Sequence, residues 1–164
     1  MKYFTGNQKE QRMKALFLIV LFSSFVSAFS PVCEAASSGQ IGIVKTLAGD
    51  VVIVRTDKTI KAEPNMKLKN GDLVSTGKDG KVGLIFDDDT IISMGSNSRI
   101  VIENFIFQPS EKKLSFIARF FQGTASFLSG QIAKLAPDMV HFEMPHATVG
   151  IRGTHFLVRV DNTD

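Results

Sequence analysis

Three kinds of residue in this sequence have side chains that could do chemistry: histidines, a run of aspartates, and an arginine between two glycines. The histidines are His141, His146 and His155. Spacings of five and nine along one extended segment do not place two imidazoles on the same strand face, because that needs an even offset at short range. The pattern therefore favours surface or rim histidines over a metal site.

The aspartate run is Asp87-Asp88-Asp89, followed by Thr90. Its carboxylates are suitable oxygen ligands for a hard cation such as calcium. A calcium loop also needs oxygen ligands at regular offsets and a glycine for the turn. The stretch DDDTIISMG has neither an Asp-x-Asp-x-Asp-Gly pattern nor a trailing glutamate. We interpret these residues as a turn and predict neither a metal nor a cofactor.

No set of catalytic residues is visible. The sequence has no Gly-x-Ser-x-Gly and no His-Glu-x-x-His, and its one cysteine, Cys33, lies in an N-terminal segment that we expect to be removed. Gly150-x-x-Gly153 is too short for a phosphate loop and is followed by a strand pattern, so no helix N-terminus faces a phosphate. We predict no catalytic residues and no enzymatic activity.

The arginine is Arg152, in the stretch ATVGIRGTHFLV. Apolar residues occupy even positions at 142 and 144, odd positions from 147 to 151, and even positions again from 156 to 160. A slip of one residue moves the side chains of a strand to its other face, so two parity changes predict two local defects. We place these defects at Pro145-His146 and near Gly153, where glycine suits a bulge or bend.

Two roles remain open for Arg152. As a structural group, it would donate charge-assisted hydrogen bonds to a carboxylate such as Asp72 or Glu143, or to turn carbonyls, and so lock the bend. As a functional group, it would present its planar guanidinium to a ligand carboxylate or a partner chain. The residue pattern favours the structural role.

The N-terminal segment has the composition of a secretory signal. Residues 15–32 contain no charge and follow Arg12 and Lys14, and small residues come after them. We expect cleavage after Ala35 or Ala36, which divides the chain into a signal peptide at 1–36 and one domain at 37–164. The alternative is an uncleaved inner-membrane anchor formed by residues 15–32. Either way, the domain is expected in the periplasm or otherwise outside the cytoplasm.

The basic character of the chain belongs to this targeting segment. Four of the 19 basic and two of the 16 acidic residues lie within 1–36, which leaves 15 basic against 14 acidic residues and a net charge of +1. No nucleic-acid partner is therefore implied.

The rest of the chain predicts short strands. Apolar residues alternate with others at 82–86, 99–102 and 114–121, and turn signals such as Asn70-Gly71, Asp79-Gly80 and Gln122-Gly123 separate the runs. Only 129–135 has the pattern of a short helical turn, and a strand is equally compatible there. We predict an all-β fold, an antiparallel sandwich, with the phenylalanines mainly in its core rather than on a base-stacking surface.

Three segments taken together resemble the FecR-type domain, named for the ferric-citrate regulator of the bacterial envelope. They are Gly71-Asp-Leu-Val-Ser-Thr-Gly77, then Gly80-Lys-Val-Gly-Leu-Ile-Phe-Asp-Asp-Asp-Thr-Ile-Ile-Ser-Met-Gly95 with Asn97-Ser98, and Thr148-Val-Gly-Ile-Arg-Gly-Thr154 with Phe156. Two departures from the family pattern are Asp88 in place of a glycine and Met144-Pro145-His146 in place of Thr-Pro-x.

The resemblance implies a jelly-roll-like extracytoplasmic domain with a sensing or binding role, linked to signalling or transport regulation. The partner would be an envelope protein or a small ligand. The anti-sigma activity of the best-known members is not implied, since no counterpart of their cytoplasmic region is recognisable. An alternative function is a structural adaptor that pairs its edge strands with an envelope protein. The candidate structural or binding residues are Gly71, Asp72, Thr76, Asp89, Thr90, Ser98, Gly150, Arg152, Gly153 and Thr154.

Overall fold

The computed structural model describes residues 39–150 and 155–161. The predicted signal or anchor segment, including Cys33, lies outside the described residues, as do Arg152, Gly153 and Thr154. Within the described ranges, no helix has the length and apolar character needed to cross a bilayer.

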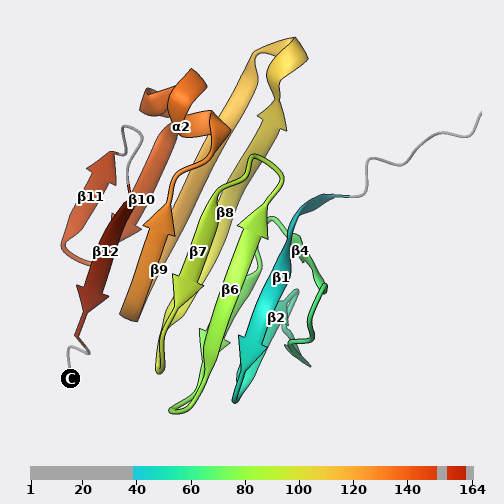
Figure 1. The fold of residues 1–164 in the computed structure, drawn as a ribbon, viewed down its shortest axis with the longest axis vertical. Helices are drawn as coiled ribbons and strands as arrows, with labels where there is room; N and C mark the ends of the chain where they lie inside the picture. The colour runs from blue at the N-terminus through green and yellow to red at the C-terminus, as the bar shows by residue number, and fades with distance from the viewer. Residues whose placement is uncertain (1–38, 151–154, 162–164) are drawn as a thin grey trace, which may run out of the picture. The chain divides into compact units, whose positions relative to one another are not determined.

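Strands make up most of the described chain, joined by tight turns (Figure 1). Their bounds are β1 (Gln40–Ala48), β2 (Val51–Arg55), β3 (Lys58–Lys61), β4 (Lys67–Lys69), β5 (Leu73–Thr76), β6 (Lys81–Phe86), β7 (Ile91–Met94), β8 (Arg99–Gln108), β9 (Lys113–Leu128), β10 (Val140–Met144), β11 (Ala147–Gly150) and β12 (His155–Val160). The short helical elements are η2 (Pro109–Glu111), α2 (Gln131–Leu135) and η3 (Pro137–Met139).

The strands form one curled sheet whose two halves face each other. The half nearer the viewer in Figure 1, called here the front sheet, has the order β4, β1, β6, β7, β9, β12. The other half, the back sheet, has the order β3, β2, β5, β8, β9, β10, β11. All pairs are antiparallel except β9 with β10. The all-β, sandwich-like antiparallel fold is thus confirmed, while the jelly-roll connectivity stays a prediction.

Strand β9 belongs to both sheets. Its first part, from Lys113 to Gln122, pairs with β8 in the back sheet, and its last part, from Gly123 to Leu128, pairs with β12 in the front sheet. Gly123 has φ of +95°, and a Cβ atom there would collide with the Ser98 side chain. The break predicted at Gln122-Gly123 is therefore wrong: the strand continues, and the glycine bends it from one sheet into the other.

The core lies between the two sheets, and the predicted alternation defines it. Val82, Leu84 and Phe86 are buried on β6, and Phe116, Ala118 and Phe120 are buried on β9. The ring centroid of Phe116 lies 5.0 Å from that of Phe86, 5.4 Å from that of Phe105 and 5.6 Å from that of Phe127. Packed aromatic rings at these separations stabilise the core beyond their area of burial.

The parity change predicted at Pro145-His146 has a different cause from the one inferred. Met144 pairs with Ala147, and Phe142 pairs with Val149, so β10 and β11 form a hairpin with a two-residue turn. Paired residues share a face, so the apolar residues of both strands point to the same side. The apolar pattern changes parity because the chain reverses direction, not because one strand is bulged. The second change, near Gly153, falls on residues outside the described ranges.

The segment 129–135, for which turn and strand were both open, contains helix α2. Ile132 and Ala133 bury one side of this helix, whereas Lys134 and Leu135 are exposed. Ala136 and Pro137 end it, since proline disfavours helical backbone at the residue before it. Helix α2 follows the last residues of β9 and lies beside the β6–β7 turn (Figure 1).

Candidate functional site

Asp72 is fully buried, and three donors use its carboxylate. Arg55 at the end of β2 donates from Nε to Oδ1 over 2.7 Å and from Nη2 to Oδ2 over 2.6 Å. The backbone N–H of Lys69 donates to Oδ2 over 2.8 Å. The hydrogen bonds to Asp72 raise the pKa of Arg55 above its ordinary value. This group joins β2 to the turn between β4 and β5.

Thr76 and Ser98 form a second buried polar group. The Thr76 hydroxyl donates to the carbonyl of Gly95 over 2.6 Å and accepts from the N–H of Ser98 over 2.8 Å. The Ser98 hydroxyl accepts from the N–H of Thr124 over 3.0 Å. These bonds join the end of β5 and the β7–β8 turn to the bend of β9. The same Ser98 side chain occupies the space that a larger residue at position 123 would need.

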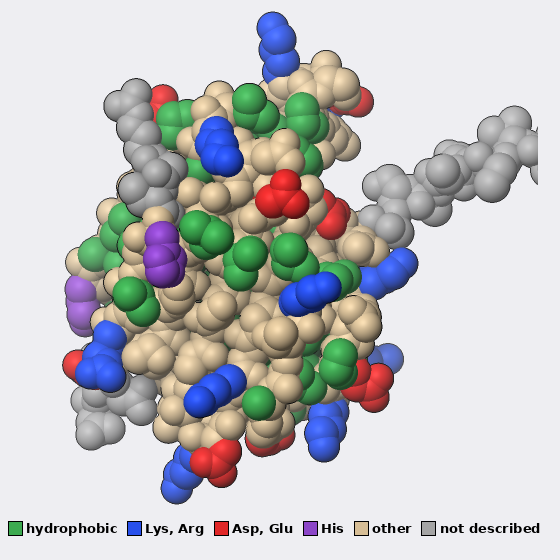
Figure 2. All heavy atoms as spheres, in the orientation of Figure 1, with side chains coloured by type: hydrophobic (Ala, Val, Ile, Leu, Met, Phe, Trp, Pro, Cys, Tyr) green, Lys and Arg blue, Asp and Glu red, His purple; other side chains and the backbone are tan. Residues whose placement is uncertain are grey.

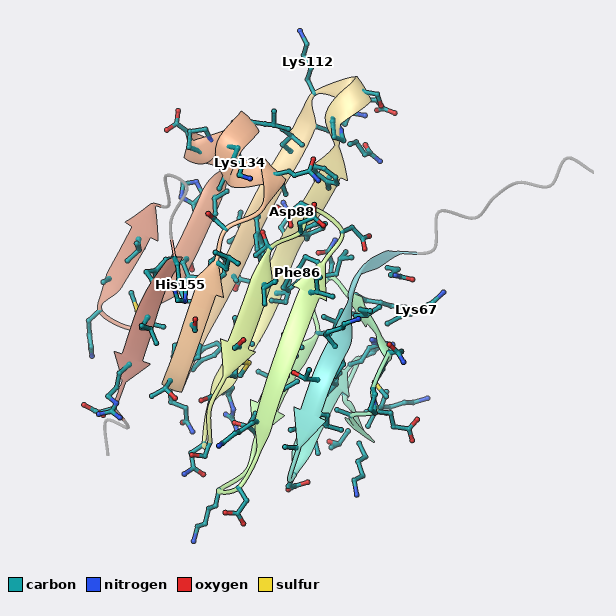
Figure 3. All side chains as sticks on the ribbon, viewed as in Figure 1. Lys67, Phe86, Asp88, Lys112, Lys134 and His155 are labelled. Atoms are coloured by element: carbon teal, nitrogen blue, oxygen red, sulfur yellow. The ribbon has the colours of Figure 1, made fainter. Side chains whose placement is uncertain are left out.

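Asp88 and Thr90 form a third group, between the β6–β7 turn and helix α2 (Figure 3). The Asp88 carboxylate accepts from the Thr90 N–H over 3.0 Å, from the Thr90 hydroxyl over 2.9 Å and from the Ile132 N–H over 3.2 Å. Gly130 precedes α2 and has no side chain to cap it, so Asp88 supplies the acceptor for a free N–H of the first turn. The Thr90 hydroxyl accepts from the Gly130 N–H over 3.0 Å.

Close packing fixes the residue type at Gly130. A Cβ atom at this position would collide with the backbone of Asp88 and Thr90. The aspartate run is thus a turn, as expected, but its middle residue is a buried anchor for α2. The sequence predicted Asp88 as a turn residue and as a departure from the family pattern, and sequence reasoning missed its role as an anchor for α2.

Three further candidates lie in exposed positions. Asp89, with φ of +66°, accepts a hydrogen bond from the Gln131 side chain over 2.8 Å. Gly71, with φ of +83°, follows Asn70 in the β4–β5 turn, and no atom lies within 4 Å of where its Cβ would be. Glycine at position 71 therefore serves the backbone conformation rather than close packing. Gly150 ends β11 opposite His141.

The carboxylates considered as partners for Arg152 have other partners. Arg55 bonds to Asp72, as described above. Arg119 donates to Glu143 from Nε over 3.0 Å and from Nη2 over 2.8 Å, and its Nη1 lies 3.0 Å from Glu103. Hydrogen bonding to Glu143, together with the charge of Glu103, raises the pKa of Arg119. This cluster lies on the outer face of the back sheet.

The histidines do not form a cluster. His141 is exposed on β10, His146 is in the β10–β11 turn, and His155 begins β12, where its Nε2 lies 2.7 Å from the Ser126 hydroxyl. Among the residues at 39–150 and 155–161, no three His, Cys, Asp or Glu side chains are close enough together to hold a metal ion.

Every buried side-chain nitrogen or oxygen in the described part of the chain has a hydrogen-bond partner. Asp72, Thr76, Thr90 and Ser98 therefore spend their hydrogen-bonding capacity on closing turns within the fold. In a sequence comparison, the family described as FecR protein matches residues 72–164.

The chain belongs to the FecR family. The matched region begins at Asp72 and includes the second and third buried groups and the segment with Arg152, whereas Arg55 and Lys69, the partners of Asp72, precede it. No curated protein and no solved structure matched the chain. A ligand at Asp72, Thr76, Thr90 or Ser98 would have to displace hydrogen bonds already made.

Sequence reasoning also missed Arg55, the partner of Asp72. Arg55 ends an apolar run, VVIVR, and nothing in the linear pattern connects it to a residue 17 positions later. One signal was available for Asp88, which replaces a glycine of the family pattern in a turn. If its carboxylate is buried there, a donor inside the protein must offset the loss of hydration of its charge.

Proposed function

We propose that this FecR protein is a non-enzymatic sensing or binding domain that acts outside the cytoplasm in the bacterial envelope. The family is one of signalling and transport regulation, and this supports a regulatory role. The observation that carries the proposal is that the family match coincides with turns whose polar groups are already paired. Because the buried polar residues within the family match hold turns in place, we infer that recognition uses the outer surfaces and the segment around Arg152.

The domain boundaries and the localisation belong to the same proposal. Residues 1–36 would direct export and residues 37–164 would form the exported domain, with residues 15–32 as a membrane anchor if cleavage does not occur. N-terminal sequencing of protein recovered from the envelope fraction tests this. A mature chain beginning near Ser37 supports cleavage, and an intact N-terminus in the membrane fraction supports the anchor. Protein that stays in the cytoplasm contradicts both.

Capture of a partner from periplasmic extract tests the binding role. The immobilised wild-type protein is compared with Arg152→Ala and with Arg159→Ala, an exposed arginine on β12 that serves as the matched control. If Arg152 contacts the partner, its variant loses the captured protein and the Arg159 variant keeps it. If neither a protein nor a small-molecule fraction of the extract binds or shifts the melting temperature, the sensing proposal is wrong.

A second candidate function is a structural adaptor that works through edge strands. Its support is that β11 and β12 each have one strand neighbour in the described structure and lie near each other at one side of the sheet (Figure 1). Leu157 on β12 is 78% exposed, which is unusual for a large apolar side chain at a sheet edge. Leu157→Lys should prevent strand addition without affecting binding at Arg152. Capture of the same partner by this variant would argue against the adaptor.

A further inference from the structure

The outer face of the front sheet carries a row of apolar side chains that crosses four strands. Ile43 on β1 pairs with Ile85 on β6, Ile85 with Ile91 on β7, and Ile91 with Leu128 on β9. Leu128 is 46% exposed, and the three isoleucines are partly exposed. Because directly paired residues share a face, these four residues form one continuous line, called here the apolar row.

Two figures show the position of the apolar row. Figure 2 shows hydrophobic side chains in a band across this face, with a histidine at one end of the band. Figure 3 labels the residues that flank the row: His155, paired with Leu128, and Lys67, paired with Ile43. The next row along the strands is small or polar at Thr46, Gly83, Ser93 and Ser126, and it ends at Leu157 on β12, which pairs with Ser126. The apolar row is therefore one residue wide on β1, β6 and β7, and the exposed Leu157 widens the apolar surface beside Leu128.

Opposite charges lie on the two sides of the apolar row. On one side is the β6–β7 turn with Asp87 and Asp89, both exposed, and beyond it Lys134 on α2. On the other side is Lys45, exposed at a bulge of β1, with Lys81 and Arg159 farther along their strands and the exposed Asp79 and Asp161 beyond these two. No ion pair among the described residues involves Lys45 or Asp87. Both charges are available to a second molecule.

We propose that this face pairs with the same face of a second copy of the chain. A two-fold axis that runs along the apolar row places each row residue against its own counterpart. The same rotation brings Asp87 of one copy over the side of the other copy that carries Lys45. Asp87 continues β6 two residues beyond Ile85, and Lys45 lies on the neighbouring strand two residues beyond Ile43. After the rotation, these two residues face each other about one strand spacing, ~4.8 Å, apart along the row.

A second copy fits this surface better than a lipid bilayer does. Tryptophan is absent from the sequence, and its one tyrosine, Tyr3, precedes the described domain, so the usual interfacial anchors are missing. The phenylalanines of β6 and β9 in this sheet, Phe86 and Phe127, are buried on the inner face. A bilayer surface also gives no reason for carboxylates on one side of the row, because anionic headgroups would repel them.

The size of the face predicts a weak, reversible dimer. Five strands at a spacing of ~4.8 Å and about six residues at ~3.3 Å each cover about 500 Å² in each copy. The pair would bury about 1,000 Å² in total, near the lower limit for a specific interface. The dissociation constant is therefore expected in the micromolar range, so that the local concentration of the protein decides whether it pairs.

Sedimentation velocity over the micromolar concentration range tests this dimer, with protein purified from cells that express the full chain. Leu128→Lys is expected to raise the dissociation constant at least about tenfold. Ile106→Lys, at an exposed apolar residue of β8 in the back sheet, is the matched control and should change it less than about threefold. Both positions are exposed, so circular dichroism should show that both variants are folded.

The charge pair gives a second, independent test. Lys45→Glu and Asp87→Lys should each weaken the dimer, and the double variant should restore it, because the exchanged charges face each other again. Three results would overturn the proposal: a wild-type monomer at all concentrations, a dimer insensitive to Leu128→Lys, or no recovery in the double variant. Binding of the monomer to anionic vesicles through Leu128 would also overturn it, in favour of a lipid surface.

Discussion

At the β4–β5 turn, the buried carboxylate of Asp72 accepts three hydrogen bonds, whereas on the outer face of the front sheet Asp87 and Lys45 have no ion-pair partner in the described structure. The first region is shared with the FecR family match, which begins at that aspartate. The outer face combines an apolar row with exposed charges on its two sides. The two regions thus use their charges differently: the turn pairs its charge within the fold, whereas the proposed dimer would pair the charges of the sheet face with a second copy.

The largest expected effect comes from removing the buried carboxylate of Asp72. Asp72→Ala leaves the Arg55 guanidinium, 26% exposed, without its partner and the Lys69 N–H without an acceptor. We expect a loss of about 3 kcal/mol in the free energy of unfolding, measured by urea denaturation. Glu143→Ala, which removes one partner of the exposed Arg119, is the control and should lose far less stability, because water screens this ion pair. If the Asp72 variant is as stable as the wild type but no longer binds its partner protein, the turn serves recognition rather than stability, and the contrast between the two regions is wrong.

Asp88→Ala should have the next largest effect. It removes the acceptor for the first turn of α2 and for both donors of Thr90, so we expect a loss of about 2 kcal/mol. Hydrogen exchange should show faster exchange at Ile132 than at amides of β8. Asp88→Asn keeps one oxygen acceptor and should lose less. Equal stability of the alanine variant and the wild type would show that α2 needs no anchor.

Asp87→Asn is expected to change the free energy of unfolding least of the three substitutions. The sign of this change is informative. Although the Asp87 side chain is exposed, desolvation by nearby protein atoms, together with the neighbouring charge of Asp88, raises the pKa of Asp87 above its ordinary value. The folded state thus holds this proton more tightly than the unfolded state does, and stability decreases as the pH rises through the raised pKa. At neutral pH, the variant should be slightly more stable than the wild type, and the difference should disappear below about pH 4.

The same substitution separates the effect of Asp87 on stability from its effect on dimerisation. Asp87→Asn should raise the melting temperature at neutral pH and at the same time weaken the dimer, since it removes a charge that faces Lys45 of the other copy. Melting at low protein concentration and sedimentation at high concentration measure the two effects separately. A variant that gains stability and dimerises as well as the wild type would show that Asp87 does not contact the second copy.

The parts of the fold that depend on local pattern were predictable. Alternation in β6 and β9 identified the buried faces, and Asn70-Gly71 and Asp79-Gly80 marked real turns. Gly123 was misread because a glycine that ends a strand and one that bends a strand give the same local signal. The hairpin at Pro145-His146 was misread because a chain reversal with a two-residue turn and a single-residue defect both shift the apolar parity.

The parts that depend on long-range pairing were not predictable from one sequence. The parallel pairing of β10 with β9 leaves no mark in the local pattern. The position of Asp88 indicates that it needs a donor, but the sequence does not show that the donor is the Ile132 N–H, 44 residues away. The apolar row was not predictable either, because its four residues come from four strands and none is unusual in its own segment. The role of Arg152 stays a prediction, because that residue lies outside the described ranges.

The continuity of β9 across the bend at Gly123 has a consequence for how the domain opens. This strand pairs with β7, β8, β10 and β12, and so connects strands of both sheets. Neither sheet can separate from β9 without exposing core rings such as Phe116 or Phe127 to water. The two sheets should therefore unfold in a single cooperative step, with the slowest amide exchange of the protein along β9.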